Sequence, residues 1–194
     1  MLRRNLLGSL FETMKCAPPL RGPRAGYFPN VVLTSHENER ARFYDDLLRG
    51  KTVIVNFMYT TCEGRCPLYT SNLLKVQRLL GDRAGREVHM YSFTLDPVVD
   101  TPRVLRNYAD AQGVGPGWRF FTGKPEDMEL LRRKLGFTEN NPELDRQKSF
   151  HTGLIRYGNE QLDRWAACPA LADPAKIVRH LSWLDIKPCE EVVA

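Results

Sequence analysis

Two cysteines, Cys62 and Cys66, stand four positions apart, directly after an apolar run and directly before a helical pattern. This order predicts a strand, a tight turn and the start of a helix, with both thiols at the turn. A helix start carries unpaired N–H groups and a partial positive charge, which lower the pKa of a nearby thiol. A thiolate attacks disulfides and binds soft metal ions, so the pair indicates either thiol–disulfide exchange or metal binding.

The spacing of the two cysteines bears on which chemistry they perform. Two intervening residues at such a turn are typical of a redox motif, whereas three separate Cys62 from Cys66. The wider spacing still permits a disulfide, but it also suits chelation. Two thiolates favour Cu(I), Zn(II) or an iron–sulfur cluster. Structural zinc needs four ligands, and the absence of a second cysteine pair in the sequence disfavours it.

A third ligand would have to come from elsewhere, and the four histidines differ in their suitability. His36 falls in a polar turn and is expected to be a solvated surface residue. His89 falls within a strand pattern, which is typical of a core histidine, and His180 lies on the last helical pattern, at its surface. His151 stands where a long polar loop enters a strand, a position that delivers a side chain to a sheet edge. His151 is therefore the candidate imidazole ligand.

Two carboxylates are candidates for a supporting role around the cysteines. Asp96 and Asp100 follow a strand pattern over 87–95, which should end beside the cysteine turn in a parallel sheet. A carboxylate there would orient His151 or tune the acidity of the thiols, as outer-shell groups of metal sites do. The alternative is that both carboxylates cap the next helix, and the sequence leaves the two interpretations open.

The elements that position these residues alternate between strand and helix patterns. Strands are expected over 31–34, 41–44, 52–59, 87–95, 118–122, 151–157 and 161–165, and helices over 67–80, 102–112, 125–135 and 174–184. Gly158-Asn159 is a hairpin turn signal between the last two strands. The alternation predicts an α/β fold with a mixed central sheet and helices on both faces. The cysteines at the end of a central strand make it thioredoxin-like, with an extra N-terminal β-hairpin.

The chain length and the distribution of Pro and Gly predict the domain organisation. The 194 residues favour one domain, which we expect over 31–187. Residues 1–30 are expected to be a flexible leader, which could be the remnant of an export signal or anchor, and residues 188–194 a tail. The chain could associate with a membrane, but we expect no transmembrane segment in it, because the apolar start is too short to span a bilayer. The roles of Cys16, Cys168 and Cys189 stay open.

The charge distribution argues against a nucleic-acid partner. The chain has 28 Lys and Arg against 23 Asp and Glu, a formal net charge of +5. The basic residues are scattered, and no basic run is interleaved with aromatic residues. The pattern therefore predicts a mildly basic, solvated surface and no nucleic-acid interface.

Several motifs in order resemble the Sco/SenC family of copper-binding, thioredoxin-like proteins. They are the segment 53–67 around the cysteines, the Asp-Pro and Asp-Thr-Pro of segment 92–102, the segment 121–126, and His151. The resemblance runs from about residue 31 to residue 184. It implies copper, as Cu(I) or Cu(II), bound by Cys62, Cys66 and His151. The chain departs from the family pattern at Thr152-Gly153 and over 158–169, which indicates a divergent branch.

The same resemblance implies a function and a location. The implied function is that of a copper metallochaperone that assists assembly of the copper centre of cytochrome c oxidase. Its partner would be an oxidase subunit or another copper or thiol protein, in the periplasm or at the outer face of the inner membrane. The alternative is a thiol–disulfide oxidoreductase in which Cys62 attacks and Cys66 resolves the mixed disulfide. Whether the chain is an enzyme is therefore open.

Overall fold

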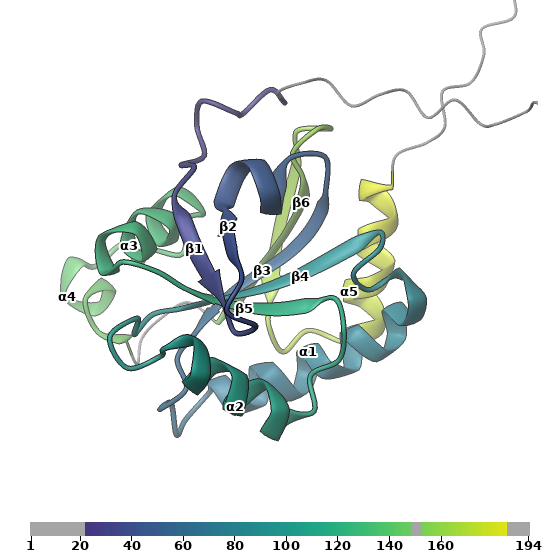
Figure 1. Cartoon of the computed structure of the whole chain (residues 1–194). Coiled ribbons are helices and arrows are strands. Elements are labelled where there is room, and N and C mark those ends of the chain that lie inside the picture. Colours follow the sequence, from purple (N-terminus) through teal and green to yellow (C-terminus); the bar gives the residue numbers. More distant parts are fainter. Residues whose placement is uncertain (1–21, 149–152, 186–194) are drawn as a thin grey trace, which may run out of the picture.

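The computed structural model describes residues 22–148 and 153–185. Its centre is a seven-stranded sheet in the order β2-β1-β5-β4-β3-β6-β7 (Figure 1). The strands are β1 (Val32–Ser35), β2 (Arg40–Arg42), β3 (Thr52–Met58), β4 (Val88–Thr94), β5 (Trp118–Thr122), β6 (Leu154–Asn159) and β7 (Arg164–Pro169). The helices are η1 (Phe43–Leu48), α1 (Cys66–Leu80), η2 (Gly81–Arg83), α2 (Pro102–Gln112), α3 (Pro125–Lys134), α4 (Pro142–Asp145), α5 (Pro174–Leu181) and η4 (Ser182–Leu184).

The three central strands β3, β4 and β5 run parallel to one another, and the flanking pairs are antiparallel. All seven residues of β3 are buried, as expected for a strand that is covered on both faces. The register pairs Met58 at the end of β3 with Thr94 at the end of β4. The loops that follow these two strands therefore leave the sheet at the same edge.

Two apolar layers cover the sheet, one on each face. One layer packs α1, α2 and α5 on the sheet and includes Leu73, Leu105 and Ile177, and the other packs η1 and α3 and includes Leu47 and Leu131 (Figure 1). The predicted mixed sheet, the helices on both faces and the N-terminal hairpin β1–β2 are thus confirmed. The helical turn η1 is wide, because the Arg49 N–H donates to the Tyr44 carbonyl five residues back.

The last hairpin differs from the sequence prediction. Gly158 and Asn159 lie inside β6, and the turn instead spans 160–163. Gly158 is needed for packing, because a Cβ atom there would lie 2.3 Å from the ring of Trp165. Asp163 supplies the positive φ of the turn, at 48°. The long polar loop expected before His151 contains the short helix α4.

The ordered domain begins before residue 31. Phe28 is only 7% exposed, and the Gly22 N–H donates to the Tyr44 hydroxyl at 3.0 Å. The Arg24 N–H donates to the carboxylate of Glu160 at 3.2 Å. Residues 22–30, which the sequence assigned to the leader, therefore pack against η1 and against the turn between β6 and β7.

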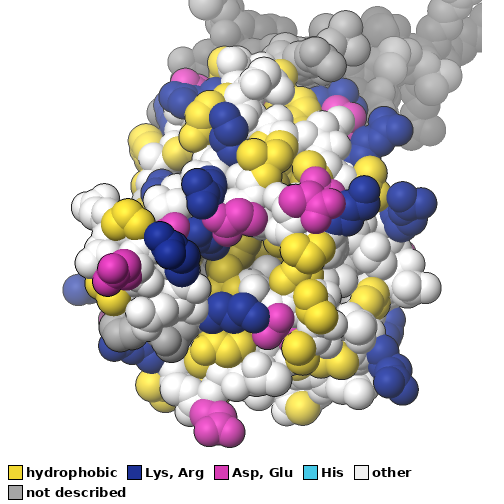
Figure 2. All heavy atoms as spheres, turned by 90° about the vertical axis from the view of Figure 1, so that its left-hand side faces the viewer, with side chains coloured by type: hydrophobic (Ala, Val, Ile, Leu, Met, Phe, Trp, Pro, Cys, Tyr) yellow, Lys and Arg dark blue, Asp and Glu magenta, His cyan; other side chains and the backbone are white. Residues whose placement is uncertain are grey.

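The face that carries α3 and α4 has a mixed surface. Figure 2 shows basic, acidic and hydrophobic side chains interspersed on it, without a field of one sign. Among the helices of the described ranges, none has the length and apolar character needed to cross a bilayer.

Candidate metal centre

The two cysteines lie at the carboxyl end of β3, one on each side of the helix start. Cys62 is in the turn that follows the strand and is partly exposed, whereas Cys66 is the first residue of α1 and is only 1% exposed. No side chain caps this end of α1. The backbone N–H groups at the start of the helix are therefore left to the sulfur atoms.

The environment separates the pKa values of the two thiols. Burial raises the pKa of Cys62, but hydrogen bonds from the backbone and thiol of Cys66, the backbone of Gly64 and the hydroxyl of Tyr59 outweigh it, so the net shift is downward. Burial dominates at Cys66 and raises its pKa to about 12. Burial, followed by the bond to Cys62, raises the pKa of Tyr59 to about 12, so its hydroxyl stays a donor. The pair combines an accessible sulfur with thiolate character and a buried, protonated one.

Asp100 supports the cysteine turn from the neighbouring loop. Its carboxylate is fully buried, and it accepts hydrogen bonds from the backbone N–H of Thr60 at 3.2 Å and from the hydroxyls of Thr60 and Thr94. Thr60 precedes Cys62 by two residues, and Thr94 ends β4. The side chain of Thr101, and not this carboxylate, caps α2. Asp100 therefore ties the cysteine turn to the adjacent strand.

Asp96 lies in the same loop as Asp100 but contacts the segment that leads to His151 instead of the cysteine turn. Its carboxylate is 17% exposed and forms an ion pair with the ammonium group of Lys148 at 2.8 Å. Lys148 is the last described residue before the gap that contains His151, so the predicted imidazole ligand lies outside the described residues. On the other side of the gap, Gly153 packs so closely on Tyr69 of α1 that a Cβ atom would lie 2.3 Å from the phenol oxygen.

A buried ion pair fixes the long loop that leads to Lys148. Arg132 of α3 donates two hydrogen bonds to the carboxylate of Asp145, at 2.6 and 2.7 Å, and a third to the carbonyl of Phe137 at 2.8 Å. Asp145 in turn accepts from the backbone N–H of Glu139 at 2.8 Å. The guanidinium lowers the pKa of Asp145 to about 2. One Arg–carboxylate pair therefore ties the loop to α3.

The other histidines occupy structural positions. His36 is half-buried, and its Nδ1 accepts from the backbone N–H of Phe120 at 3.2 Å, so the expectation of a solvated side chain is wrong. Burial lowers the pKa of His89 to about 4, as for the core histidine predicted from its strand. His180 lies 3.4 Å from the Tyr157 hydroxyl. In the described part of the chain, no three His, Cys, Asp or Glu side chains are grouped as a metal would require.

Sequence reasoning missed four residues that build the surroundings of the cysteines: Tyr59, Thr60, Tyr69 and Lys148. Tyr59 and Thr60 precede the cysteines directly, so their position was a usable signal. Tyr69 lies one helical turn after Cys66, which the helix prediction could have supplied. Nothing local in the sequence identifies Lys148 as the partner of Asp96, because the contact joins distant segments. Cys168 lies in β7 as a free thiol, and Cys16 and Cys189 lie outside the described residues.

Comparison with known proteins decides the family. A family model described as SCO1/SenC matches residues 30–184, which is most of the chain. The chain belongs to the SCO1/SenC family. A SCO1 homologue of Bacillus subtilis (strain 168) is 31% identical over 150 residues, covering 76% of this chain and 70% of the relative. A Stutzerimonas stutzeri protein whose name refers to copper binding is 26% identical over 114 residues, 59% of this chain and just over half (54%) of that relative.

Solved structures of the SCO1/SenC family share the fold at low sequence identity. A SCO1/SenC lipoprotein of Bacillus anthracis superposes with a TM-score of 0.66 at 21% identity, over 79% of this chain and 92% of the other. Copper-bound ScoI of Bradyrhizobium japonicum gives 0.64 at 22% identity, over 79% and 96%. BsSco, described with a disulfide switch and as a cytochrome c oxidase assembly protein, gives 0.64 at 19% identity, over 79% and 90%. The thioredoxin-like α/β fold predicted from the sequence is confirmed.

Proposed function

We propose that this SCO1/SenC protein binds a copper ion through Cys62, Cys66 and His151 and passes it on during assembly of the copper centre of cytochrome c oxidase. The observation that carries the proposal is the cysteine pair at the uncapped start of α1, with the two thiols hydrogen-bonded to each other. Copper is the cargo here. Two thiolates and one imidazole are a soft donor set that suits copper, and they leave a position open for transfer.

The two segments that flank His151 support its role as the third ligand. Lys148 is held by Asp96, in the loop after β4, and Gly153 rests on Tyr69, one helical turn beyond Cys66. An extended chain spans at most about 3.5 Å per residue. Because these anchors lie only three residues before and two residues after His151, they support the proposal that His151 is the third ligand.

Proton release accompanies copper binding in this scheme. The sulfur of Cys62 already has thiolate character, whereas burial keeps the thiol of Cys66 protonated. Because a metal ligand must be deprotonated, binding displaces the Cys66 proton. The Tyr59 hydroxyl donates to the Cys62 sulfur and stabilises its negative charge. Copper affinity is therefore expected to increase with pH.

Copper titration of the reduced protein tests the three-ligand site. We expect stoichiometric copper binding that is lost in Cys62→Ala and Cys66→Ala. In His151→Ala the copper affinity should be at least about tenfold lower, because the loss of a ligand weakens metal binding more than the loss of an outer-shell group does. His180→Ala, which changes a histidine on α5, is the matched control. Equally tight, stoichiometric copper in His151→Ala would overturn the three-ligand model.

A second candidate function is thiol–disulfide exchange, which the asymmetry of the two thiols favours. The Cys62 thiolate would attack a disulfide of a partner protein, releasing one partner thiolate and forming a mixed disulfide. Cys66, after losing its proton, would attack the Cys62 sulfur, which frees the second partner thiolate and leaves a Cys62–Cys66 disulfide. Cys66→Ala should trap the mixed disulfide on non-reducing gels, and Cys62→Ala should not. Trapping by both variants alike would contradict the assignment.

We infer that the protein acts on the outer side of a bacterial or mitochondrial inner membrane, in the periplasm or its equivalent. The inference is supported by the structurally similar Bacillus anthracis protein, which is described as a lipoprotein. The partner would be an oxidase subunit or another copper or thiol protein. Fractionation of cells that produce the full chain tests this, and recovery in the cytoplasmic fraction alone would contradict it.

A further inference from the structure

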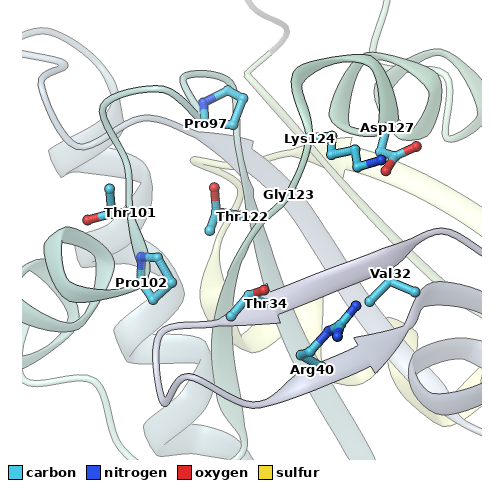
Figure 3. Close-up of a pocket in the computed structure, with 10 residues that line it drawn as sticks. All are labelled: Val32, Thr34, Arg40, Pro97, Thr101, Pro102, Thr122, Gly123, Lys124 and Asp127. Carbon is cyan, nitrogen blue, oxygen red and sulfur yellow. The ribbon is translucent and has the colours of Figure 1, made fainter.

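A groove of 610 Å³ lies at the same edge of the sheet as the cysteines, between the β1–β2 hairpin, the loop before α2 and the start of α3 (Figure 3). None of its lining residues belongs to the candidate metal centre. Its volume falls in the range of roughly 300–1,000 Å³ that is usual for binding sites. Thr101, in one wall of the groove, directly follows Asp100 in the sequence, and Asp100 holds the cysteine turn through Thr60.

The end of β5 places an unpartnered hydroxyl at the groove. Thr122 is only 6% exposed, and its Oγ1 atom is buried without a hydrogen-bond partner in the described part of the chain. Figure 3 shows this oxygen pointing toward Pro97 on the opposite wall. Buried polar atoms are almost always paired, so an orphaned hydroxyl at a groove indicates a ligand that would pair with it.

Two cations line the groove without a partner of their own. Neither the guanidinium of Arg40 nor the ammonium of Lys124 forms an ion pair or a side-chain hydrogen bond within the described ranges. The start of α3 follows Lys124, and no side chain caps it, so the positive end of the helix faces the same space. Asp127 is the one carboxylate of the lining, which leaves a net positive charge. The surroundings favour an acidic group.

The remaining walls are apolar and shaped for more than a small ion. Val32 is 40% exposed along one wall, and Pro97 and Pro102 form the other. In the loop that continues this second wall, Val98 is 77% exposed and Val99 is 44% exposed. Such exposed apolar side chains beside unpaired cations are typical of a site where another protein binds.

We propose that this groove docks an extended segment of a partner protein that carries an acidic side chain. The carboxylate lies between Arg40 and Lys124, the segment's backbone pairs with the Thr122 hydroxyl, and its apolar side chains cover Val32 and the two prolines. The docked partner contacts the loop between β4 and α2. Asp100 of the same loop holds the cysteine turn through Thr60. The proposal rests on the proposed function only in taking that partner to be the protein that exchanges copper or thiols with the cysteines.

Peptide titration of the metal-free, reduced protein tests the groove independently of copper. The probe is a short acetylated peptide of alternating Val and Asp, and the matched probe alternates Val and Asn. We expect the acidic peptide to shift the amide resonances of Thr34, Thr122 and Lys124 and to saturate. Its affinity should fall about tenfold in Lys124→Glu and about threefold in Thr122→Val, in line with a lost charge pair and a lost hydrogen bond.

The control variant is Lys75→Glu, which reverses an exposed charge on α1 away from the groove and should leave the affinity unchanged. Equal binding of the Val/Asn peptide, unchanged affinity in Lys124→Glu, or an absence of shifts at the groove would overturn the proposal. Inorganic phosphate that produced the same shifts and competed fully at equal concentration would replace it with a small-anion site. Failure of copper binding in the titration described above would leave these peptide results unaffected, so the two proposals fail separately.

Discussion

The candidate centre has two halves that are held in different ways. On the cysteine side, the turn after β3 is fastened by Asp100, a fully buried carboxylate with three hydrogen-bond donors from Thr60 and Thr94. On the histidine side, the loop before the gap is fastened by charge pairs, Arg132 with Asp145 and Lys148 with Asp96. The hydrogen bonds of Asp100 are part of the core. The Arg132–Asp145 pair lies just beneath the surface, and the Lys148–Asp96 pair lies at the surface.

The difference teaches which half of the site is preorganised. Buried hydrogen bonds and the buried Arg132–Asp145 pair are screened little by salt, whereas the more exposed Lys148–Asp96 pair is weakened by salt and contributes little stability. The cysteines are therefore expected to keep their geometry over a wide range of conditions, while delivery of the histidine responds to pH and ionic strength. Such a division would suit the proposed carrier, because release of a histidine ligand would lower the affinity for copper without disturbing the fold.

Removing the carboxylate of Asp100 should have the largest effect. Asp100→Ala leaves the donors of Thr60 and Thr94 buried without an acceptor, and we expect the free energy of unfolding to fall by about 4 kcal/mol. The cysteine turn should loosen as well, so Cys62 should lose the hydrogen bonds that lower its pKa. Urea unfolding measures the first effect, and the pH dependence of iodoacetamide labelling measures the second.

Asp110→Ala serves as the control for this change. Asp110 is an exposed carboxylate on α2, so its removal should change the unfolding free energy by less than about 0.5 kcal/mol. Equal stability of the two variants would show that the buried network does not hold the cysteine half, and the contrast between the two halves would disappear.

Breaking the larger charge pair should affect the histidine half alone. In Arg132→Met, the carboxylate of Asp145 loses its partner while the aliphatic packing is kept, and we expect a loss of about 2 kcal/mol. Copper affinity should fall because the loop before His151 is no longer tied to α3, whereas the labelling rate of Cys62 should stay at the wild-type value. A parallel change in both quantities would contradict the division into two halves.

The Arg132–Asp145 pair should also make the free energy of unfolding depend on pH in the acidic range. Arg132 lowers the pKa of Asp145 in the folded protein to about 2, from an ordinary value of 3.8. A carboxyl group whose folded pKa is depressed stabilises the fold above its unfolded pKa and loses this contribution as pH falls toward the folded pKa. Wild-type stability should therefore decrease between about pH 4 and pH 2. Urea unfolding at a series of pH values should show a smaller decrease in Arg132→Met, and an identical decrease would refute the assignment.

The cysteine half could be predicted from the sequence to a large extent. The apolar run of β3, the turn and the helix start are local patterns, and they place Cys62 and Cys66 correctly. Asp100 was a candidate because it follows the next strand. Its three donors could not be foreseen, because they depend on the register that sets Met58 beside Thr94. Local pattern therefore located the candidate residues in the fold, and tertiary pairing determined their partners.

The histidine half and the groove were much harder to predict. The contact between Asp96 and Lys148 joins segments separated by one strand and three helices, so no periodicity or spacing indicates it. The dipeptide Gly158-Asn159 is typical of a hairpin turn, but it lies inside β6, where the ring of Trp165 leaves room only for a glycine. The unpartnered hydroxyl of Thr122 is a property of packing alone. Where residues act through distant neighbours, composition and motif carry no signal.

The smallest expected effect concerns the exposed pair on the histidine side. Lys148 is 49% exposed, so Lys148→Gln should lower the unfolding free energy by no more than about 0.5 kcal/mol. The copper affinity of Lys148→Gln should be about threefold lower than that of the wild type at low salt. The difference should disappear at high salt, because salt then screens the Lys148–Asp96 pair of the wild type. Titrations of wild type and Lys148→Gln at both ionic strengths measure this. Lys176→Gln, on α5, is the control and should match the wild type throughout. A difference between Lys148→Gln and wild type that persists at high salt would mean that Lys148 acts through packing, and the histidine half would then resemble the cysteine half.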